Sequence, residues 1–522
     1  MTTEAVFQGI VGKIVSGEIT TKAQLTEEKK RISKINRLNK VIRDSDILSC
    51  ASENTDQVID LLRKKDTRTI SGVTPLAIMT PPLACPPQAQ CIYCPGGPKV
   101  GSAKAYTGFE PAARRAKAFN FDSYEQAKNR IQQFLNTGHS ADKLELIIMG
   151  GTFTYQNPRF QDRFMKGCLD AMNNNISETY DQAKLFNETA QHRCIGMTFE
   201  TRPDCCGKNE IDRMLYYGGT RVELGVQNPD NEIYKIIKRG HTREHVIQAT
   251  RDLKESAFKV LYHVMPGLPG SSPGKDVEMF KGLFENQDFR PDMLKIYPCL
   301  LVDQKYGLTG TYDLWKNGEW EPYNDEQAAQ VIAQAHKYIP RYCRVMRIQR
   351  DIPTNLLVTG IKYANLRQLV DAEMQNQGIQ CQCIRCREIK NRVPEKIELR
   401  RIDYEASQGR EVFLSLDDAD RDKIIGFIRL RLPRKPWRSE LQGNTALVRE
   451  LHVYGKSLQV GHKDDKAVQH KGHGKRLLKE AEEIAKDEFG MDNLAVISGI
   501  GVRPYYYKQG YKPEGAYVTK KL

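Results

Sequence analysis

Three cysteines fall within ten residues of one another in a stretch rich in proline and glycine. The thiols of Cys85, Cys91 and Cys94 can gather around one point only on a loop, which the flanking prolines and glycines supply. A structural zinc site or an iron–sulfur cluster normally takes four protein ligands, and no fourth cysteine is near in sequence. One cluster iron without a protein ligand is what a chelating substrate or cofactor needs. The spacing alone leaves zinc, free thiols and a cluster as equal alternatives.

A glycine loop forms the second candidate site. Residues 469–475, Gln-His-Lys-Gly-His-Gly-Lys, come directly before a segment with helical periodicity. Glycines at such a place let the backbone approach a pyrophosphate, whose charge meets unpaired N–H groups and the helix dipole. A simple loop-to-helix cap explains the same glycines equally well. The run Tyr505-Tyr506-Tyr507 downstream, taken alone, also suits the edge of a core with its hydroxyls in water.

A cysteine knuckle forms the third candidate site. Cys381, Cys383 and Cys386 have the Cys-x-Cys-x2-Cys spacing of zinc ligands. Their place between two domains suits a structural metal site that holds the two together. Arg385 and Arg387 would offset the thiolate charge. No fourth ligand is evident, so exposed, uncoordinated thiols remain the alternative.

The elements that must position these groups alternate between strands and helices. From about residue 74 to 370, short strands are separated by helical segments, which predicts βαβ units, right-handed crossovers and a parallel sheet. Side chains that do chemistry should then gather at the C-terminal ends of the strands. The expected strands are 144–149, 194–200, 221–226, 260–265 and 293–298. The residues at or beyond their ends include Gly150, Gly151, Thr152, Glu200, Arg202 and Gln227.

Two further regions flank this unit. The first stretch, up to about residue 70, is helical in pattern and carries two clusters of basic residues, which form either a solvated helix face or a phosphate-binding surface. A helix expected over 474–489 places its apolar residues on one face. It belongs to a smaller α/β unit after the knuckle, with strands expected near 411–415, 424–432, 445–454 and 494–500.

The composition limits the class of protein. The 522 residues predict three or four domains at about 150 residues each. An apolar fraction of 40% excludes wholesale disorder, and no apolar run is long enough to span a bilayer. No secretory signal is seen, so the 13 cysteines favour metal ligands and free thiols in a reducing compartment, and we expect a cytoplasmic protein. A net charge of +14 makes a polyanion a plausible partner.

The order of the first motifs resembles that of the radical S-adenosylmethionine (SAM) enzymes. The cysteine loop opens the alternating region, and Met149-Gly150-Gly151-Thr152 follows one strand later. In that family three cysteines hold a [4Fe–4S] cluster whose remaining iron is chelated by SAM, and a glycine pair lets the backbone approach the SAM amino group. The cysteine spacing here is x5–x2, whereas x3–x2 is commoner.

The glycine loop resembles the acetyl-CoA loop of the GCN5-related N-acetyltransferases. Its pattern, Gln-x-x-Gly-x-Gly, follows an expected strand at 447–454. The segment 505–511 matches the aromatic segment after the last conserved strand of that family. The resemblance implies that this unit binds acetyl-CoA.

Together the two regions resemble the catalytic subunit family of Elongator and its archaeal and bacterial members, the tRNA uridine(34) 5-carboxymethyl synthases. Specific motifs are Tyr-Thr-Gly-Phe-Glu-Pro at 106–111, Glu-Thr-Arg-Pro-Asp at 200–204 and Arg-Glu-Leu-His-Val-Tyr-Gly at 449–455. The short gap between the first two cysteines and the complete knuckle indicate a prokaryotic-type member. A full Elongator-type complex is therefore not assumed, and a homodimer stays open.

The resemblance implies an α/β fold in which a radical SAM partial (β/α) barrel is joined to a GCN5-related N-acetyltransferase (GNAT) domain. A basic helical segment precedes both. We expect residues 1–73 to be this tRNA-binding segment, 74–375 the radical SAM domain, 376–395 the knuckle and linker with a zinc site, and 396–522 the acetyl-CoA-binding domain.

The implied reaction installs a carboxymethyl group on C5 of wobble uridine-34 of tRNA. The cluster, reduced by an external electron donor, cleaves SAM to a 5′-deoxyadenosyl radical, which takes hydrogen from the methyl group of acetyl-CoA. The carbon radical adds to the uridine, and hydrolysis of the thioester leaves the carboxymethyl group. The sequence does not identify the residue that activates the water.

The resemblance also assigns residues to each ligand. The cluster ligands are Cys85, Cys91 and Cys94, and the catalytic candidates are Tyr505, Tyr506 and Lys143. The SAM candidates are Gly150, Gly151, Thr152, Glu200, Arg202 and Gln227. The acetyl-CoA candidates are Lys143, Glu450, Leu451, His452, Val453, Gln469, Gly472, His473, Gly474, Lys475 and Tyr506. The zinc candidates are Cys381, Cys383 and Cys386.

Basic residues along the chain are candidates for the path of the anticodon stem-loop. Any single run is equally well a solvated surface, but together with the net charge of +14 the runs favour tRNA. The candidates are Lys29, Lys30, Arg31, Lys34, Arg37, Arg344, Arg347, Arg350 and Lys435, and the run around Lys435 also holds Arg429, Arg431, Arg434 and Arg438.

Two other functions fit parts of the sequence. A protein lysine acetyltransferase with a structural cluster domain would use Glu450 or His452 as its general base and would need no SAM. A non-catalytic tRNA-binding scaffold would carry the metal and coenzyme motifs as vestiges. The intact cysteine triad and the intact glycine loop argue against the scaffold.

Overall fold

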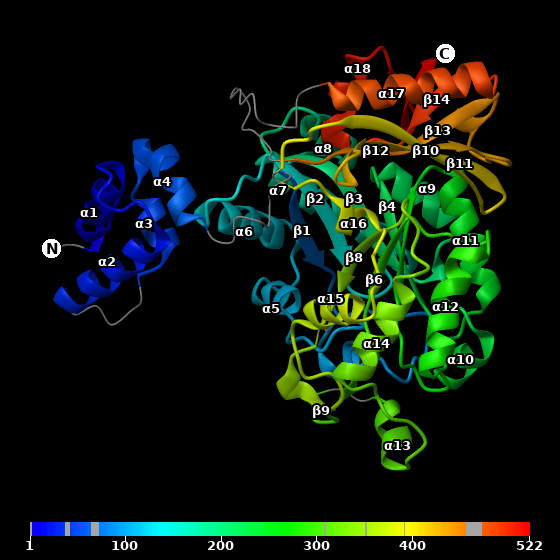
Figure 1. Cartoon of the computed structure of the whole chain (residues 1–522), viewed down its shortest axis with the longest axis horizontal. Coiled ribbons are helices and arrows are strands. Elements are labelled where there is room, and N and C mark those ends of the chain that lie inside the picture. The colour runs from blue at the N-terminus through cyan, green and yellow to red at the C-terminus, as the bar shows by residue number, and fades with distance from the viewer. Residues whose placement is uncertain are drawn as a thin grey trace.

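Two seven-stranded sheets, a short two-stranded sheet of β7 (Leu301–Val302) and β9 (Leu357–Thr359), and a separate group of helices make up the described fold (Figure 1). The computed structural model describes residues 3–36, 42–63, 72–306, 309–349, 352–390, 392–455 and 472–522. The expected α/β class is confirmed, because each large sheet is combined with helices. Within these ranges no helix is both long and apolar enough to cross a membrane.

The basic N-terminal segment folds into helices around a small core of its own, which includes the buried Ile10 and Ile47. In Figure 1 these helices lie to one side of the rest and reach it near α6 (Ser123–Asn136). There Arg63 donates a hydrogen bond to the backbone carbonyl of Gly138 over 2.9 Å. The helices are α1 (Thr3–Val15), α2 (Lys22–Ile35), α3 (Asp44–Ser49) and α4 (Thr55–Leu62).

The first sheet is parallel throughout, in the order β1-β2-β3-β4-β5-β6-β8. The five expected strands are all present, and β1 and β8 extend the sheet at its two ends. The strands are β1 (Thr74–Met79), β2 (Lys143–Met149), β3 (Arg193–Thr201), β4 (Arg221–Gln227), β5 (Lys259–Val264), β6 (Met293–Ile296) and β8 (Arg344–Ile348). Helices connect successive strands, as parallel pairing requires. They include α7 (Pro158–Asn173), α9 (Lys208–Tyr216), α11 (Arg243–Glu255), α12 (Pro273–Glu285) and α14 (Asp325–Ala335).

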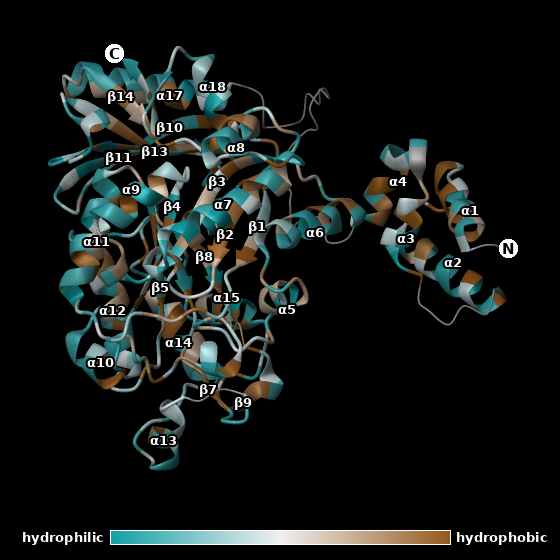
Figure 2. Ribbon diagram, turned by 180° about the vertical axis from the view of Figure 1, so that it is seen from behind, coloured by the Kyte–Doolittle hydropathy of each residue, from teal (hydrophilic) through white to brown (hydrophobic). Residues whose placement is uncertain are grey.

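One face of this sheet is polar. Figure 2 shows hydrophobic residues along β1 to β3 and hydrophilic surfaces on α9, α11 and α17 around the sheets. Because side chains alternate along a strand, residues in register share a face. The register sets Glu200 of β3 beside Glu223 of β4, and His263 of β5 beside Lys295 of β6. Charged side chains on adjacent strands need solvent or polar partners, so this face is suited to line a cavity.

The second sheet has the order β10-β11-β12-β13-β14-β16-β15. β13 and β14 are parallel neighbours only from Thr445 to Val448 of β13. The helix α17 (His473–Glu483) buries Leu477 and continues as a π-helical turn, Ile484–Glu488, rather than as the α-helix expected there. The strands are β10 (Ile397–Ala406), β11 (Gly409–Asp418), β12 (Lys423–Leu432), β13 (Thr445–Val453), β14 (Asn493–Val496), β15 (Lys512–Glu514) and β16 (Tyr517–Lys521).

Buried ion pairs join the two sheets. Arg449 of β13 donates to both carboxylate oxygens of Asp292, over 2.6 and 2.8 Å, and Asp292 directly precedes β6 of the first sheet. Arg431 of β12 pairs with Glu255 of α11. Arg429 and Arg431 are fully buried, so the interpretation that they face tRNA is wrong. Their charges instead hold the second sheet against the first.

Candidate functional site

The loop after β1 carries Cys85, Cys91 and Cys94, all of them half-exposed. Cys85 Sγ lies 3.5 Å from the hydroxyl of Thr152, just beyond β2. Cys94 Sγ accepts a hydrogen bond from the backbone N–H of Ala105 over 3.3 Å. In the described part of the chain these three sulfurs are not among the groups whose ligand atoms all lie within 4.8 Å of one another. Such a spread suits a four-iron cluster, which takes thiolates at separate corners, better than one zinc ion.

The glycine pair after β2 adjoins this loop. Gly150 and Gly151 have φ angles of 115° and 94°, which L side chains rarely adopt. A Cβ on Gly150 would lie 2.3 Å from the hydroxyl oxygen of Thr80, and one on Gly151 would lie 2.9 Å from Cβ of Lys104. Only glycine fits at both positions, so the turn next to Thr152 presents bare backbone. The SAM amino group is expected to approach this turn closely, and it can do so only where no side chain covers the backbone.

Two buried arginines surround Cys91. Arg239 donates to Cys91 Sγ over 3.3 Å and Arg202 over 3.7 Å. Asp204 holds Arg202 with two hydrogen bonds of 2.9 and 3.0 Å. Burial raises the pKa of the Cys91 thiol, but the charges of Arg239 and Arg202 outweigh it, so this pKa lies below its ordinary value. The sequence interpretation missed Arg239, which is 148 residues from Cys91 and belongs to no motif.

A row of titratable side chains crosses the polar face of the first sheet. Glu200 accepts a hydrogen bond from the Tyr106 hydroxyl over 3.0 Å. Glu223 Oε2 lies 2.7 Å from Nε2 of His263 and forms an ion pair with Lys295. Burial raises the pKa of Glu200. Burial also raises the pKa of Glu223, but Lys295 and His263 together lower it well below its ordinary value, so the two neighbouring carboxyl groups differ in proton affinity.

Sequence reasoning assigned Glu200 to SAM and missed Glu223, His263 and Lys295. The available signal was weak: single charged residues within otherwise apolar strands. Gln227, the remaining strand-end candidate, ends β4 with a φ of 65°, an uncommon conformation for a residue other than glycine. Its carbonyl accepts a hydrogen bond from the N–H of Met265 over 2.7 Å.

The acetyl-CoA candidates of the second sheet come together at one place. Glu450, Leu451, His452 and Val453 are partly exposed on β13, beyond the point where β14 leaves it. The helix α17 starts beside them at His473, so Gly472, Gly474 and Lys475 lie at its N-terminal end, where backbone N–H groups are unpaired. Gln469 lies outside the described residues.

Two tyrosines of α18 (Arg503–Tyr507) complete this group. A Cβ on Gly474 would lie 3.2 Å from the Tyr505 hydroxyl, which is buried and has no hydrogen-bond partner among the residues that the structure describes. Tyr506 is buried beside it, with ring centres 5.1 Å apart, and burial raises its pKa. A buried, unpartnered hydroxyl at a helix N-terminus is available to a ligand in that position.

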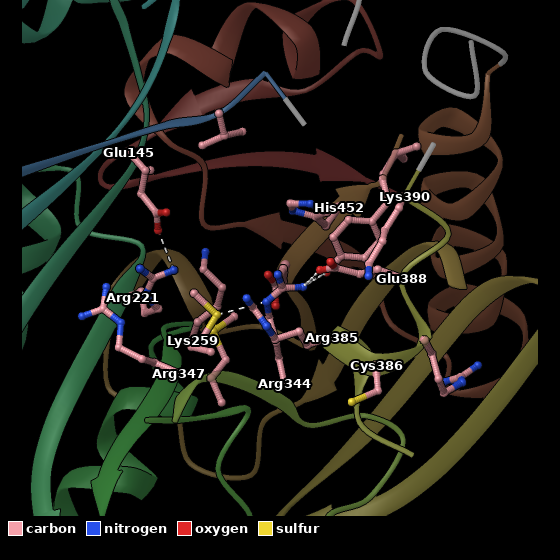
Figure 3. Close-up of a pocket in the computed structure, with 18 of the residues that line it drawn as sticks. Glu145, Arg221, Lys259, Arg344, Arg347, Arg385, Cys386, Glu388, Lys390 and His452 are labelled. Atoms are coloured by element: carbon pink, nitrogen blue, oxygen red, sulfur yellow. Dashed lines mark hydrogen bonds and ion pairs between the residues drawn. The ribbon is translucent and has the colours of Figure 1, made fainter. Parts of the chain in front are cut away.

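One cavity of 2540 Å³ joins this group to the polar face of the first sheet (Figure 3). Its walls include His452 and Tyr506 on one side and Glu223 and Lys295 on the other. Lys143, at the start of β2, lines it as well. The cavity therefore spans both halves of the described structure.

The first cysteine loop lies outside the walls of this cavity but is connected to them. Glu223 lines the cavity, and its ligand atoms lie within 4.8 Å of those of Glu200 and His263. Glu200 in turn is hydrogen-bonded to Tyr106, and the neighbouring Ala105 donates to Cys94. Two side chains thus separate the cavity from the cysteine loop.

The cysteine knuckle is compact. The sulfurs of Cys381, Cys383 and Cys386 all lie within 4.8 Å of one another, as the ligands of one ion must. Arg367 of α15 (Leu366–Asn376) donates to Cys386 Sγ over 3.1 Å. In the described ranges no further His, Cys, Asp or Glu joins this group, so the sequence and the fold supply three ligands.

The basic residues expected to meet tRNA fall into two kinds. Paired residues include Lys29 with Asp44, Lys30 with Glu27, Arg31 with Glu28, and Arg344 with Glu388 and the Tyr454 hydroxyl. Arg347 donates to the Tyr297 hydroxyl over 3.4 Å. Lys34 and Lys435 are exposed. Arg37 and Arg350 fall outside the described ranges. Arg344 thus links three segments of the fold, which limits its freedom to meet a phosphate.

Four families of domains match the chain. The ELP3 N-terminal domain matches residues 3–70, the radical SAM superfamily 84–281, the radical SAM C-terminal domain 291–376, and the acetyltransferase (GNAT) family 382–511. The parallel sheet is thus the expected radical SAM partial barrel, and the second sheet is the expected GNAT domain.

Whole proteins match along nearly their entire length. A tRNA uridine(34) acetyltransferase of Methanocaldococcus jannaschii is 50% identical over an alignment of length 521 that covers 95% of each sequence. A protein of the same name from Dehalococcoides mccartyi is 46% identical, over 88% of this chain and 100% of its own length. The solved structure of the archaeal Methanocaldococcus infernus Elp3 with an N-terminal deletion has a TM-score of 0.77 at 48% identity, and covers 87% of this chain and 100% of its own.

Proposed function

Because the chain belongs to the family of Elp3 and the tRNA uridine(34) acetyltransferases, we propose that it modifies the wobble uridine of tRNA, and that the group it installs at C5 is carboxymethyl. The single observation that carries this proposal is the cavity of 2540 Å³. The reaction needs a radical source, a two-carbon thioester and an unstacked pyrimidine in one chamber. The cavity takes its walls from both the radical SAM and the GNAT domains, and the side chains of Glu200 and Tyr106 lie between it and the cysteine loop that would hold the radical source.

The radical half of the site fits a cluster and SAM. Cys85, Cys91 and Cys94 would hold a [4Fe–4S] cluster, which when bound supplies the electron that splits SAM. Arg239 and Arg202 stabilise the thiolate of Cys91 in advance. The bare turn at Gly150, Gly151 and Thr152 lets SAM approach the backbone beside Cys85. An external electron donor is required.

The coenzyme half of the site fits acetyl-CoA. The pyrophosphate would accept hydrogen bonds from the backbone N–H groups at the start of α17, where the helix dipole also favours an anion. The pantetheine arm would then follow Glu450–Val453 along β13 and lead the acetyl group past Tyr505 and Tyr506 into the cavity. Lys143 would hold the thioester end from the side of the first sheet.

The remaining space in the cavity suits a flipped nucleotide of a single-stranded loop. Its walls carry more basic than acidic side chains, so they favour a phosphate backbone. Lys34 and Lys435 are exposed on other parts of the surface, where they would neutralise phosphates further along the stem. We expect the affinity for tRNA to fall steeply with salt, because each neutralised phosphate releases counterions.

The knuckle is proposed as a structural zinc site. Cys381, Cys383 and Cys386 gather three sulfurs between the two domains, and Cys381 and Cys386 line the cavity. A zinc ion there would fix the linker against α15 and so set the distance between the two halves of the site.

The experiment that tests the proposed function is an anaerobic incubation of the reconstituted protein with tRNA, SAM, acetyl-CoA and a reductant. Nucleoside mass spectrometry should then find carboxymethyluridine at position 34, in amounts that depend on both SAM and acetyl-CoA. Transfer of acetyl groups to protein lysines without SAM, and no modified uridine, would support the rival protein acetyltransferase instead.

A further inference from the structure

Lys259 opens β5 and lies in the wall of the cavity, among Arg221, Arg344 and His452 (Figure 3). In the described part of the chain no hydrogen bond or ion pair engages its ammonium group. An amine that faces a cavity without a partner is available to a ligand. The proposed carboxymethylation reaction gives Lys259 no role.

A series of contacts connects Lys259 with the strand that is expected to carry the coenzyme. Glu450, which the GNAT resemblance puts along the coenzyme, accepts from Arg429 Nε over 2.9 Å. Arg429 Nη1 lies 3.6 Å from Asp292, and Asp292 accepts from the backbone N–H of Val260 over 2.8 Å. Three contacts thus lead from the coenzyme strand to the residue next to Lys259. Glu450 and Lys259 both line the same cavity.

The charged surroundings set the protonation of Lys259. Burial lowers the pKa of its amine to about 8. The carboxylates of Glu450, Glu145 and Asp292 raise it, and the guanidinium of Arg221 lowers it. At pH 7 the group is therefore mostly an ammonium ion, and its burial strengthens the effect of this charge on a neighbouring dipole.

Four other charged groups of the cavity are already engaged. Lys295 is paired with Glu223, and Arg221 with Glu145 over 2.5 Å. Glu450 is engaged by Arg429, as described. Arg344 is paired with Glu388. Each would have to give up a partner to stabilise a new negative charge, whereas Lys259 would not.

We propose that the ammonium group of Lys259 stabilises the oxyanion that forms when water attacks the thioester carbonyl, which makes Lys259 a catalytic residue of the hydrolytic step. This inference rests on the proposed function. The oxygen of water bonds to the carbonyl carbon and the carbon–sulfur bond breaks. One proton of the water passes to the departing sulfur to give free CoA, and the other is released from the new carboxylic acid. No oxidant or reductant is needed.

The proposal fixes the sign of the pH dependence. The protonated form of Lys259 is the active one, so thioester hydrolysis slows as pH rises through about 8. In a Lys259→Arg variant the charge persists above that pH, and the alkaline decline disappears. In a Lys259→Met variant the rate falls about 100-fold, the loss expected for one oxyanion donor, while the KM for acetyl-CoA changes little.

The test uses the full-length protein, reconstituted anaerobically with tRNA, SAM, acetyl-CoA and a reductant. Free CoA thiol and modified uridine are both measured from about pH 6.5 to about pH 9.5, the range that brackets the pKa of Lys259. Lys390→Met is the matched control, because Lys390 lines the same cavity, is exposed and has no role in the mechanism. Its pH profile should equal that of the parent protein.

Each result decides one question. A parent protein that forms no carboxymethyluridine overturns the proposed function. A parent protein that forms it, together with a Lys259→Met variant of unchanged rate, overturns only the role of Lys259. A rate that rises with pH, together with an inactive Lys259→Arg variant, means that Lys259 is a general base and also overturns the oxyanion role. If Lys259→Met fails to fold, the profile of Lys259→Arg decides alone.

Discussion

Two sets of three cysteines present the same donor atom in different ways. Cys381, Cys383 and Cys386 are separated by one and two residues, and their sulfurs converge within 4.8 Å. The first loop separates its first two cysteines by five residues, and its sulfurs do not converge to that limit. The length of chain between donors therefore decides whether a site closes on one ion or stays wide enough for a cluster.

The surroundings of the two sets differ as well. Cys91 meets two buried arginines, one directly after β3 and the other after α10 (Asn231–Ile236), so that elements far apart in sequence control its charge. Cys386 meets Arg367 of the neighbouring α15. The first set is built into the reacting half of the fold, whereas the knuckle is held by a local partner. The wide site therefore depends on the whole domain, and the compact site depends mostly on its own segment.

The largest effect is expected from Cys91→Ser. Loss of one cluster ligand should remove bound iron and sulfide. It should lower the formation of modified uridine more than about 100-fold, because loss of a residue that only hydrogen-bonds to a metal ligand already costs up to about 100-fold. Iron analysis and the visible absorption of the cluster measure this. Zinc content should stay at the parent level, as it should in the control Cys50→Ser, which removes a half-exposed cysteine of the N-terminal helices. An unchanged iron content in Cys91→Ser would contradict the assignment of the cluster to the first cysteine loop.

An intermediate effect is expected from Cys383→Ser. This buried thiol belongs to the compact set, so its loss should release zinc and lower the free energy of unfolding by about 4 kcal/mol, as loss of a structural metal does. Metal analysis and thermal unfolding followed by circular dichroism measure this. The cluster absorption should persist. Equal loss of iron and zinc would show that the two sites are not separate.

The smallest effects are expected from a matched pair of arginines. Arg239→Gln removes the donor to Cys91, and Arg367→Gln removes the donor to Cys386. The first should slow the cleavage of SAM about tenfold and leave zinc affinity unchanged, and the second should weaken zinc about tenfold and leave SAM cleavage unchanged. The rate of SAM cleavage is measured in samples quenched at set times, and the affinity for zinc is measured by competition with a chelator. A swapped or shared pattern would refute the view that each arginine serves its own sulfur.

Local patterns in the sequence predict much of the candidate site. The three cysteines of each set, the glycine pair after β2 and the glycines before α17 stand within a few residues of one another, so spacing alone exposed them. Contacts across the sheet were not accessible in this way. Arg239 and the row of Glu223, His263 and Lys295 come together only because parallel strands set their registers side by side.

The burial of charged side chains is a second property that the spacing of residues in the sequence does not predict. Arg429 and Arg431 look like a basic surface in the sequence, because alternate arginines on a strand point to the same side. The second sheet turns that side toward the first, where Asp292 and Glu255 neutralise them. The sign of the charge was visible in the sequence, but its partner was not.

The amino-acid sequence by itself determined the kinds of donor atoms, the alternation of strands and helices and the order of the two domains. These follow from local spacing and periodicity, which need no knowledge of distant segments. Only the tertiary structure decided that one cavity joins the halves, that Lys259 faces it with no partner among the described residues, and that charged strands meet at a buried interface. Such facts depend on which surfaces pack together, and packing is fixed by contacts between residues hundreds of positions apart.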